Sequence, residues 1–302
     1  MAVDLQLERA LEQEAQLLGR KLVAGEEVKR HPRIVVLTWN LFHGRDDPPN
    51  PALHTWRSRL LRVTERDATH AQVNRPLLDE FAAALAALEW DVALLQEVPP
   101  GWLRALATAA EAGAASVLTS RNVLHVVRGA LARLNPDLIA SAEGGSNQLL
   151  MRAPWRIDAV ERETIARRPE RRRMLLARLI GPEDRCVTVA NLHASTGAAA
   201  AGDVMRAART ATAWAGGGPL VFGGDLNVSP ASRPDVFRAL EREHGLRGPT
   251  PGDAIDHLLV RGLVPLEAPR RLPDSVRELA LIGGGRIRLS DHPCVAGSFE
   301  VE

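Results

Sequence analysis

The sequence predicts an α/β fold in which stacked β-sheets are flanked by helices. From His31 onward many short apolar runs, each typical of a β-strand, follow one another, and few long helical patterns separate them. Of the 302 residues, 45% are hydrophobic and 25% are charged, which is typical of a soluble globular protein with a sizeable core. This length permits one large domain or two of ordinary size.

The first thirty residues form the first expected element. Apolar side chains recur at helical spacing from Val3 to Leu22, with Glu, Gln and Arg between them. We therefore expect an N-terminal amphipathic helix over residues 1–30. Its mixed charge favours packing on the domain or on a second subunit over a regulatory or membrane-surface role.

Strands dominate the main predicted domain, residues 31–302. We expect a helix at residues 77–88 and strands at residues 34–38, 92–95, 149–152, 174–180, 187–191, 220–222, 255–260 and 295–299. Residues 45–75 interrupt the pattern with three prolines and a charged stretch, which predicts an inserted loop with a helical cap. Within this insertion we expect Leu60, Leu61 and Val63 to pack.

Charge and cysteine usage limit the class of protein. The 38 basic and 37 acidic residues nearly balance, so net charge neither favours nor excludes a nucleic-acid ligand. Cys186 and Cys294 lie far apart and no signal-peptide pattern opens the chain, which predicts a reducing, cytoplasmic location. No apolar run approaches the ~20 residues that span a bilayer, so we expect no membrane insertion.

Polar residues gather at six predicted strand ends. The motifs are TWN with Asn40, LQE with Glu97, NLH with Asn191 and His193, GDLN with Asp225 and Asn227, ID with Asp256, and SDH with Asp291 and His292. Side chains two residues apart on an extended chain point to the same side, so each such pair can face one point. Taken singly, each motif is more typical of a turn, a cap or a structural residue than of a functional site. Their number and order favour a shared site.

The chemistry of these residues favours a hard divalent cation and phosphate. Carboxylates bind such cations through oxygen, and amides can donate hydrogen bonds to phosphate oxygens. Magnesium keeps several waters and takes one or two protein carboxylates, which fits a site built from few acids and several amides. Zinc is less favoured because the sequence has neither Cys-rich spacing nor an HExxH motif.

The ordered set TWN, LQE, NLH, GDLN, ID and SDH resembles the endonuclease/exonuclease/phosphatase superfamily, which has the DNase I-like fold. The resemblance runs from about residue 34 to the C-terminus. It implies a four-layer α/β sandwich with two packed mixed β-sheets flanked by helices. The activity that it implies is divalent-metal-dependent hydrolysis of a phosphoester.

The resemblance also implies metal ligands. Glu97 is expected to be the principal ligand of Mg²⁺, with Mn²⁺ as an alternative. Asn40 is expected beside it, and Asp291 is expected to bind the ion directly or through water.

Catalytic roles follow from the same resemblance. Asp225 would orient or deprotonate the attacking water, and Asn227 would hold the metal or the scissile phosphate. His193 would bind a phosphate oxygen. His292 would act as an acid/base or charge-stabilising imidazole, oriented by Asp256 through its other ring nitrogen. An aspartate behind a histidine favours the cationic imidazole and fixes its tautomer, which suits a group that faces phosphate.

Three further residues are candidates for substrate binding. Asn191 shares the NLH motif with His193, and Asn147 lies in EGGSNQLLMR, where a plain turn is an equal alternative. Arg171 belongs to an arginine-rich stretch, residues 167–173, that could follow a polyanion backbone. A solvated charged loop is the alternative there.

The substrate class is narrowed by what the motifs lack. The interval between Asn227 and Asp256 is short and has Phe237 as its one aromatic residue, which disfavours abasic-site repair. AIDHLL lacks the Cys-Asp-Arg pattern of inositol polyphosphate phosphatases. We therefore expect a phosphodiesterase or nuclease that acts on nucleic acid, either DNA or RNA, or on a nucleotide-like diester. The alternatives are a phosphomonoesterase for a small or lipid-derived phosphate and a non-catalytic binding module. Protein partners are not predicted.

Overall fold

The computed structural model describes residues 32–119, 125–136, 138–139, 145–168, 170–282 and 284–301. The amphipathic helix predicted for residues 1–30 lies outside the described residues. Within the described part of the chain, no helix is both long enough and apolar enough to cross a membrane.

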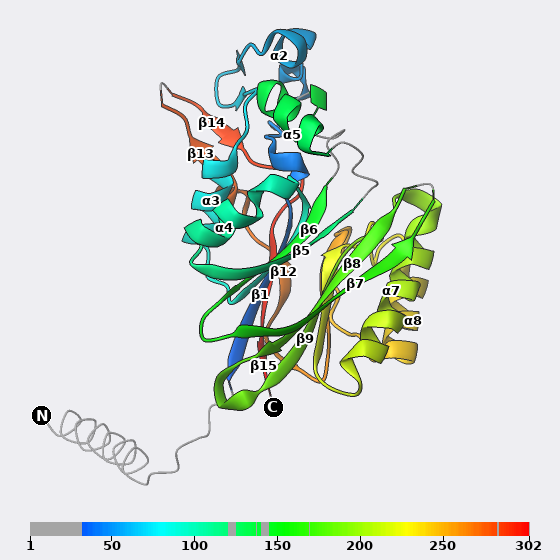
Figure 1. Cartoon of the computed structure of the whole chain (residues 1–302). Coiled ribbons are helices and arrows are strands. Elements are labelled where there is room, and N and C mark those ends of the chain that lie inside the picture. Colours follow the sequence, from blue (N-terminus) through cyan, green and yellow to red (C-terminus); the bar gives the residue numbers. More distant parts are fainter. Residues whose placement is uncertain are drawn as a thin grey trace, which may run out of the picture. The chain divides into compact units, whose positions relative to one another are not determined.

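A six-stranded mixed sheet forms one half of the core (Figure 1). Its strand order is β12-β15-β1-β4-β6-β5, and β1 runs parallel to β4 while the other neighbours are antiparallel. The bounds are Arg33–Asn40 for β1, Val92–Val98 for β4, Ala112–Leu118 for β5, Ser146–Arg152 for β6, Val264–Arg271 for β12 and Val295–Glu300 for β15.

A five-stranded mixed sheet forms the other half. Its order is β11-β10-β9-β8-β7, and only β9 and β10 pair in parallel. The bounds are Arg156–Ala166 for β7, Arg172–Ile180 for β8, Cys186–His193 for β9, Leu220–Asp225 for β10 and Asp256–Arg261 for β11. Each sheet thus contains one parallel pair, whose strands end at the same edge.

Helices and short hairpins complete the described chain. The helices are α2 (Trp56–Leu61), α3 (Leu78–Ala87), α4 (Leu103–Ala109), α5 (His125–Leu134), α7 (Ala200–Ala215) and α8 (Pro234–His244). Single 3-10 turns are η1 (Phe42–Gly44), η2 (Pro51–Leu53), η3 (Pro100–Trp102), η4 (Pro182–Asp184), η5 (Gly197–Ala199) and η6 (Asp274–Val276). The hairpins pair β2 (Glu65–Arg66) with β3 (Ala71–Gln72), and β13 (Glu278–Ala280) with β14 (Arg286–Arg288).

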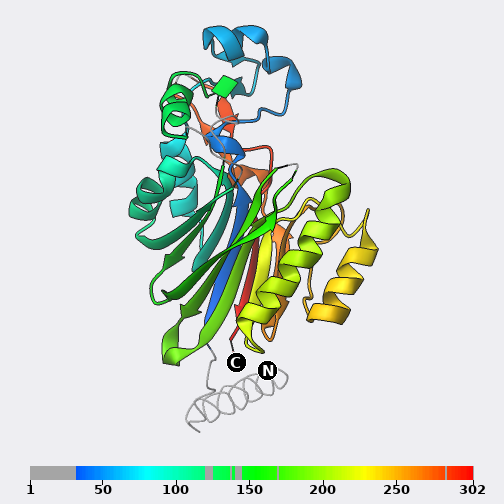
Figure 2. The ribbon, with the colours of Figure 1, turned by 45° about the vertical axis from the view of Figure 1, so that its right-hand side comes forward.

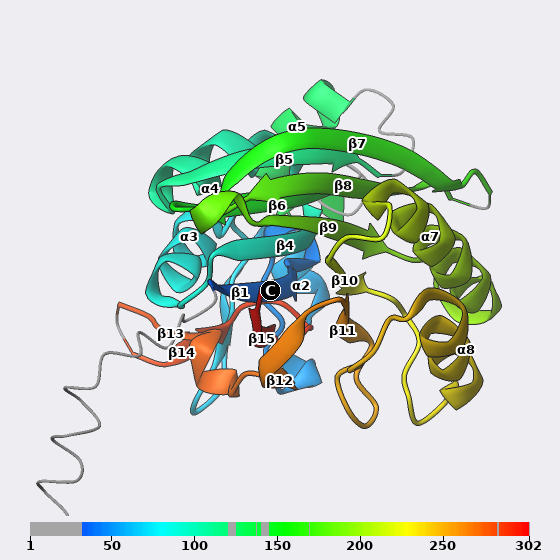
Figure 3. The same cartoon turned by 90° about the horizontal axis from the view of Figure 1, so that it is seen from below.

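The two sheets pack face to face, with helices on both outer faces. In β1, Ile34 and Val36 join the apolar cluster between the sheets, whereas Leu37 and Trp39 face α3 and α4, because successive strand side chains alternate between faces. Helices α7 and α8 cover the outer face of the five-stranded sheet (Figures 2 and 3). This arrangement confirms the predicted four-layer α/β sandwich.

Helix α7 shows how the sequence allows a helix to approach the sheet closely. Its buried positions Val204, Ala207, Ala208 and Ala211 lie at helical spacing and carry small side chains. The helix ends at Gly216, which has a left-handed φ of 62°. The outer layer is therefore held close to β9 and β10, the strands that carry part of the site.

The structure corrects the expected packing within residues 45–75. This segment contains η2, α2, β2 and β3, but Leu60 and Leu61 of α2 are 60% and 55% exposed. The prediction that these two leucines pack is wrong. The buried residue of α2 is Ser58 instead.

Candidate active site

The candidate site lies where the parallel strand pairs end, at the upper end of the sheets in Figure 1. In the five-stranded sheet, Asp225 at the end of β10 pairs with His193 of β9 on one side and with Asp256 of β11 on the other. In the six-stranded sheet, Asn40 pairs with Gln96, so Glu97 follows one residue beyond. The strand register therefore brings together residues from five distant motifs.

Glycine in the GGD sequence allows this approach. Gly224 has a φ of 123°, and a Cβ atom there would lie 1.9 Å from the carbonyl oxygen of Leu192 on β9. Any side chain at this position would force β9 and β10 apart, because Cβ contacts this short do not occur. Gly224 thus keeps Asp225 beside His193.

Backbone strain is concentrated at the site. Glu97 has a φ of 51°, at a point where the pairing of β4 with β6 becomes irregular between Leu95 and Val98. A β-bulge of this kind redirects a side chain at the end of a strand. Other non-glycine residues with positive φ at this edge are Phe42, His43, Asn227 and Ser290. Such conformations cost about 1–3 kcal/mol each and cluster at functional sites.

Asn40 joins the two sheets at the site. Its Nδ2 atom donates to Oδ2 of Asp225 at 3.1 Å, and its Oδ1 atom accepts from the backbone N–H of Phe42 at 3.0 Å. A hydrogen bond from Asn40 also helps to stabilise the charged form of Glu97. The amide therefore holds two carboxylates and the start of η1 in place.

His292, Asp256 and Asp225 form a buried charge cluster. His292 Nδ1 lies 2.8 Å from Asp256 Oδ2, and its Nε2 lies 3.9 Å from Asp225 Oδ2. Burial would lower the pKa of His292, but the hydrogen bond and charge of Asp256, with the charges of Asp225 and Asp291, raise the pKa to about 10. His292 is accordingly an imidazolium near neutral pH.

Asp225 is more easily protonated than an ordinary aspartate. Burial and the nearby charge of Asp256 raise the pKa of Asp225 to about 7, although His292 and hydrogen bonds from Asn40 and Asn227 oppose the shift. The backbone N–H of Asn227 donates to Asp225 Oδ1 at 3.1 Å. Asp225 is therefore able to take up a proton near neutral pH.

Two further histidines at the site are neutral. Burial, followed by the charge of Arg45, lowers the pKa of His43 to about 4. Burial and the charge of Arg172 lower the pKa of His193 well below its usual value. His43 Nε2 lies 3.2 Å from Glu97 Oε2, and His193 Nε2 lies 3.5 Å from Asp225 Oδ2. The site thus contains one cationic and two neutral imidazoles.

Glu97 and Asp291 fit a hard divalent cation. Burial raises the pKa of both carboxyl groups, and the charge of Glu97 further raises the pKa of Asp291. Two carboxylates that repel each other in a partly desolvated site would be stabilised by a shared cation, and their donor atoms are oxygens. The donor set therefore agrees with Mg²⁺ or Mn²⁺.

A second set of potential metal ligands overlaps the charge cluster. One atom each of Asp225, Asp256 and His292 lies within 4.8 Å of the others. Here, however, Nδ1 of His292 is already hydrogen bonded to Asp256, and the raised pKa of His292 keeps its ring protonated. A protonated imidazole does not ligate a metal, so binding of an ion by all three residues would require His292 to lose that proton.

Asn191, which the sequence suggested as a substrate contact, lies between the two sheets. Its side chain has no exposed surface, and Nδ2 donates to the carbonyl oxygens of Leu95 at 3.0 Å and Gln148 at 2.8 Å. Its Oδ1 accepts from Gln96 Nε2 at 2.7 Å. Asn191 therefore links the two sheets beneath the site.

The two other predicted substrate contacts also have internal partners. Asn147 is fully buried, and its Nδ2 donates to the carbonyl oxygen of Arg173 at 2.9 Å. Arg171 donates to the carbonyl oxygen of Thr119 at 3.4 Å. Asn227 lies at the site edge, where its Nδ2 donates to the carbonyl oxygen of Ala194 at 3.2 Å.

Sequence reasoning missed His43 and Arg172. Together with Glu97 and His193, these two residues line a cavity of about 460 Å³ at the site. Arg172 Nη1 lies 3.4 Å from His193 Nδ1, and its side chain is 11% exposed. The sequence signal for His43 is its position three residues after Asn40. For Arg172 the only signal is the arginine-rich stretch, whose members are not distinguished by sequence.

Comparison with known families agrees with this geometry. The model of the Endonuclease/Exonuclease/phosphatase family matches residues 37–292, so the chain belongs to that family. Members of the family are hydrolases that act on phosphoester bonds. No curated protein sequence gives a significant match.

Solved structures share the fold at low sequence identity. A Bacteroides vulgatus endonuclease/exonuclease/phosphatase is 15% identical, with a TM-score of 0.58, over 90% of this chain and 100% of its own. The Bacteroides thetaiotaomicron mannosyl-6-phosphatase Bt3783 is 13% identical, with a TM-score of 0.59, over 88% and 99%. D. rerio TDP2 complexed with a single-strand DNA product is 14% identical, with a TM-score of 0.52, over 89% and 99%. These similarities establish the DNase I-like fold.

Proposed function

We propose that this protein is a divalent-metal-dependent phosphodiesterase that acts on nucleic acid or on a nucleotide-like diester. The observation that carries the proposal is the Asp256–His292 pair, which holds an imidazolium 3.9 Å from the carboxylate of Asp225. This combination offers a cation for phosphate and a proton acceptor for water within one site. The likeness in fold to TDP2, which was solved with a DNA product, supports a nucleic-acid substrate.

Glu97 and Asp291 would hold Mg²⁺ or Mn²⁺, with Asn40 fixing the orientation of Glu97. The bound ion would neutralise negative charge on the phosphoryl oxygens. His43 Nε2 lies 3.2 Å from Glu97 Oε2 and would also help to hold the glutamate in position. Asn40 Oδ1 accepts from the backbone N–H of Phe42 and has a second lone pair with which it would contact the ion.

The proton and the phosphate charge are then handled by the residues of the five-stranded sheet and by His292. Asp225 takes a proton from the attacking water as the water oxygen bonds to phosphorus. The bond from phosphorus to the leaving oxygen breaks, the leaving alkoxide takes a proton from solvent, and Asp225 returns its own proton to solvent. His292, kept cationic by Asp256, donates to a phosphoryl oxygen and stabilises the charge that develops there. His193 and Arg172 bind the remaining phosphate oxygens, and Asn227 fixes Asp225 through its backbone N–H.

Two other functions are the alternatives to a phosphodiesterase. A phosphomonoesterase is the second candidate, because the fold is shared with a mannosyl-6-phosphatase. A non-catalytic binding module would keep the fold without turnover. Nucleic-acid binding by Arg172 and its neighbours would weaken steeply with salt, whereas binding of a small phosphate would depend on salt far less.

Hydrolysis of bis(p-nitrophenyl) phosphate and p-nitrophenyl phosphate tests the proposal. We expect diester cleavage with Mg²⁺ or Mn²⁺, loss of cleavage in EDTA, and at least a 100-fold decrease in Glu97→Gln and His292→Ala. Asp158→Asn, which changes an exposed carboxylate on β7, is the matched control. Preferential cleavage of the monoester would favour the phosphatase. If neither compound is cleaved, and plasmid DNA, single-stranded DNA and RNA are not cleaved either, both the phosphodiesterase and the phosphomonoesterase proposals are contradicted.

A further inference from the structure

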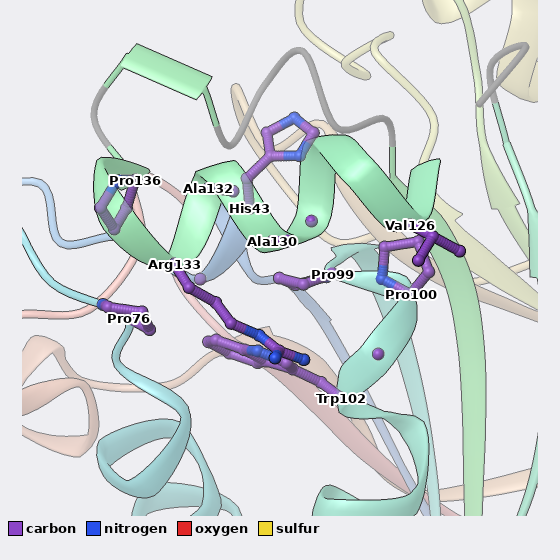
Figure 4. Close-up of a pocket in the computed structure, with 13 residues that line it drawn as sticks. His43, Pro76, Pro99, Pro100, Trp102, Val126, Ala130, Ala132, Arg133 and Pro136 are labelled. Atoms are coloured by element: carbon purple, nitrogen blue, oxygen red, sulfur yellow. The ribbon is translucent and has the colours of Figure 1, made fainter. Parts of the chain in front are cut away.

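A second cavity adjoins the candidate site. It has a volume of about 400 Å³ and is bounded by η1, η3 and α5, with Pro76 from the segment before α3 (Figure 4). A volume of this size is sufficient for a small organic ligand. The proposed hydrolysis uses no residue of this cavity except His43.

His43 connects the cavity to the site. The residue lines both cavities, and its Nε2 lies 3.2 Å from Glu97 Oε2. Its Nδ1 is buried and has no hydrogen-bond partner among the described residues. His43 is thus a wall shared by the two cavities, so a ligand in one would lie next to a ligand in the other.

The walls of the cavity are flat, apolar and rigid. Pro99 and Pro100 follow Glu97 after a single residue, and the backbone N–H of Trp102 donates to the carbonyl oxygen of Pro99 at 2.9 Å. Trp102 lies so close to Gly44 that a Cβ atom on Gly44 would be 2.3 Å from the indole ring. The indole is thereby fixed between Gly44 and Phe81, whose ring centroid is 6.0 Å away.

Helix α5 closes the opposite wall and brings a positive charge. The side chain of Arg133 extends from α5 into the cavity towards Trp102 (Figure 4). Within the described part of the chain, Arg133 takes part in no ion pair. Asn135, just beyond α5, donates to the carbonyl oxygen of Arg59 at 2.9 Å and accepts from Asn74 at 3.3 Å. These bonds fix the end of the helix that carries Arg133.

We propose that this cavity binds the planar ring of a phosphoester substrate, such as a nucleobase, while the phosphate occupies the site beside Glu97. The inference rests on the proposed function and specifies its substrate class. Proline rings and an indole provide flat apolar contact, and a base that stacks on an aromatic side chain gains about 1–3 kcal/mol. Arg133, which extends into the cavity, would bind a polar edge of the ring.

A pair of esters with the same leaving group tests the inference. Thymidine 5′-(p-nitrophenyl phosphate) carries a base, and methyl p-nitrophenyl phosphate carries none. We expect the wild-type protein to prefer the thymidine ester in kcat/KM by about tenfold, which corresponds to ~1.4 kcal/mol. Ala130→Trp, on the exposed surface of α5 where it lines the cavity, should remove this preference without slowing cleavage of the methyl ester. Retention of the preference in Ala130→Trp would overturn the inference.

Leu131→Trp is the matched control, because Leu131 is the next residue on α5, is 45% exposed and lies outside the cavity lining. It should behave as the wild-type protein does. Circular dichroism and melting temperature would establish that both variants fold.

Calorimetric binding of thymidine 5′-monophosphate separates this inference from the proposed function, because it requires no turnover. Binding to the wild-type protein and to Leu131→Trp, but at least tenfold weaker binding to Ala130→Trp, would support binding of the base in this cavity even if no ester were cleaved. Equal affinity in all three proteins, or no binding to the wild-type protein, would contradict it.

Discussion

Nδ1 of His292 lies 2.8 Å from Oδ2 of Asp256, and both side chains are almost completely shielded from water. On its other side, Nε2 of His292 faces Asp225 at 3.9 Å. One histidine therefore stands between two buried carboxylates. This relationship fixes the orientation of the ring and keeps its positive charge beside the acids of the site, where it adds to the charge of Arg172 in attracting a phosphate.

Asp256→Asn should strongly reduce turnover while leaving the fold intact. The amide preserves the size of the side chain but removes the charge that keeps His292 cationic, so we expect kcat for a diester to fall by about 100-fold or more. Asp253→Asn is the matched control, because Asp253 is exposed and pairs with Arg271 on the surface. A purely structural role for Asp256 would predict loss of stability with nearly unchanged kcat in the folded protein.

Stability of the metal-free protein should decrease at alkaline pH because of His292. Its pKa is raised from 6.5 to about 10 in the folded state, so its stabilising contribution is complete below about pH 6.5 and is lost as the pH rises through about 10. The difference in free energy of unfolding between wild type and His292→Gln, measured by denaturation in EDTA, should therefore shrink from pH 7 to pH 10. A constant difference would indicate that the folded protein does not hold His292 as a cation.

Arg172→Ala should weaken substrate binding more than Arg171→Ala does. Arg172 lines the cavity of the site beside His193, whereas Arg171 donates to a backbone carbonyl oxygen. We expect KM to rise about tenfold in Arg172→Ala, as for loss of ~1.4 kcal/mol of binding, and to change less than twofold in Arg171→Ala. The reverse order would restore the sequence-based assignment of Arg171 to substrate binding.

Asn191→Ala should lower the free energy of unfolding rather than alter the chemistry. Removal of its amide takes a buried donor from the carbonyl oxygens of Leu95 and Gln148, and one such loss costs about 1–3 kcal/mol. Gln96 Nε2 loses one acceptor but keeps its bonds to Thr38 and Leu94. We expect a loss of about 3 kcal/mol by chemical denaturation. Asn50→Ala, which removes only exposed hydrogen bonds, should cost less than about 1 kcal/mol. Unchanged stability in Asn191→Ala would contradict this structural role.

The fold could be predicted where strands are buried on both faces. The apolar runs of β1, β9 and β10 are unambiguous in sequence. Seven of the eight expected strands lie within strands of the structure, and the eighth, residues 255–260, begins one residue before β11. The missed strands have less distinctive sequences. β5 is rich in alanine, and β12 is exposed and contains Pro265 and Pro269, because an edge strand needs fewer ladder hydrogen bonds.

The positions of the site residues were harder to predict than their identities. Strand ends in the sequence did indicate Glu97, Asp225 and His292, but alternation along β9 does not reveal that Asn191 lies between the sheets while His193 reaches the site. The position of His43 at the site depends on its left-handed backbone conformation, with φ of 54°, which no local sequence pattern predicts. The sequence therefore supplied the residue types, whereas strand register and turn geometry decided which side chains meet.

The residues of the site are divided between the two sheets: Asn40 and Glu97 belong to the six-stranded sheet, and His193 and Asp225 belong to the five-stranded one. The apolar layer between the sheets, in which Leu94 and Leu258 pack, is consequently a spacer that sets how far apart these two sets of groups stand. A change of side-chain volume in that layer would misalign the two sets and leave each one internally intact. Distance from the site is for this reason a poor guide to which substitutions slow the reaction.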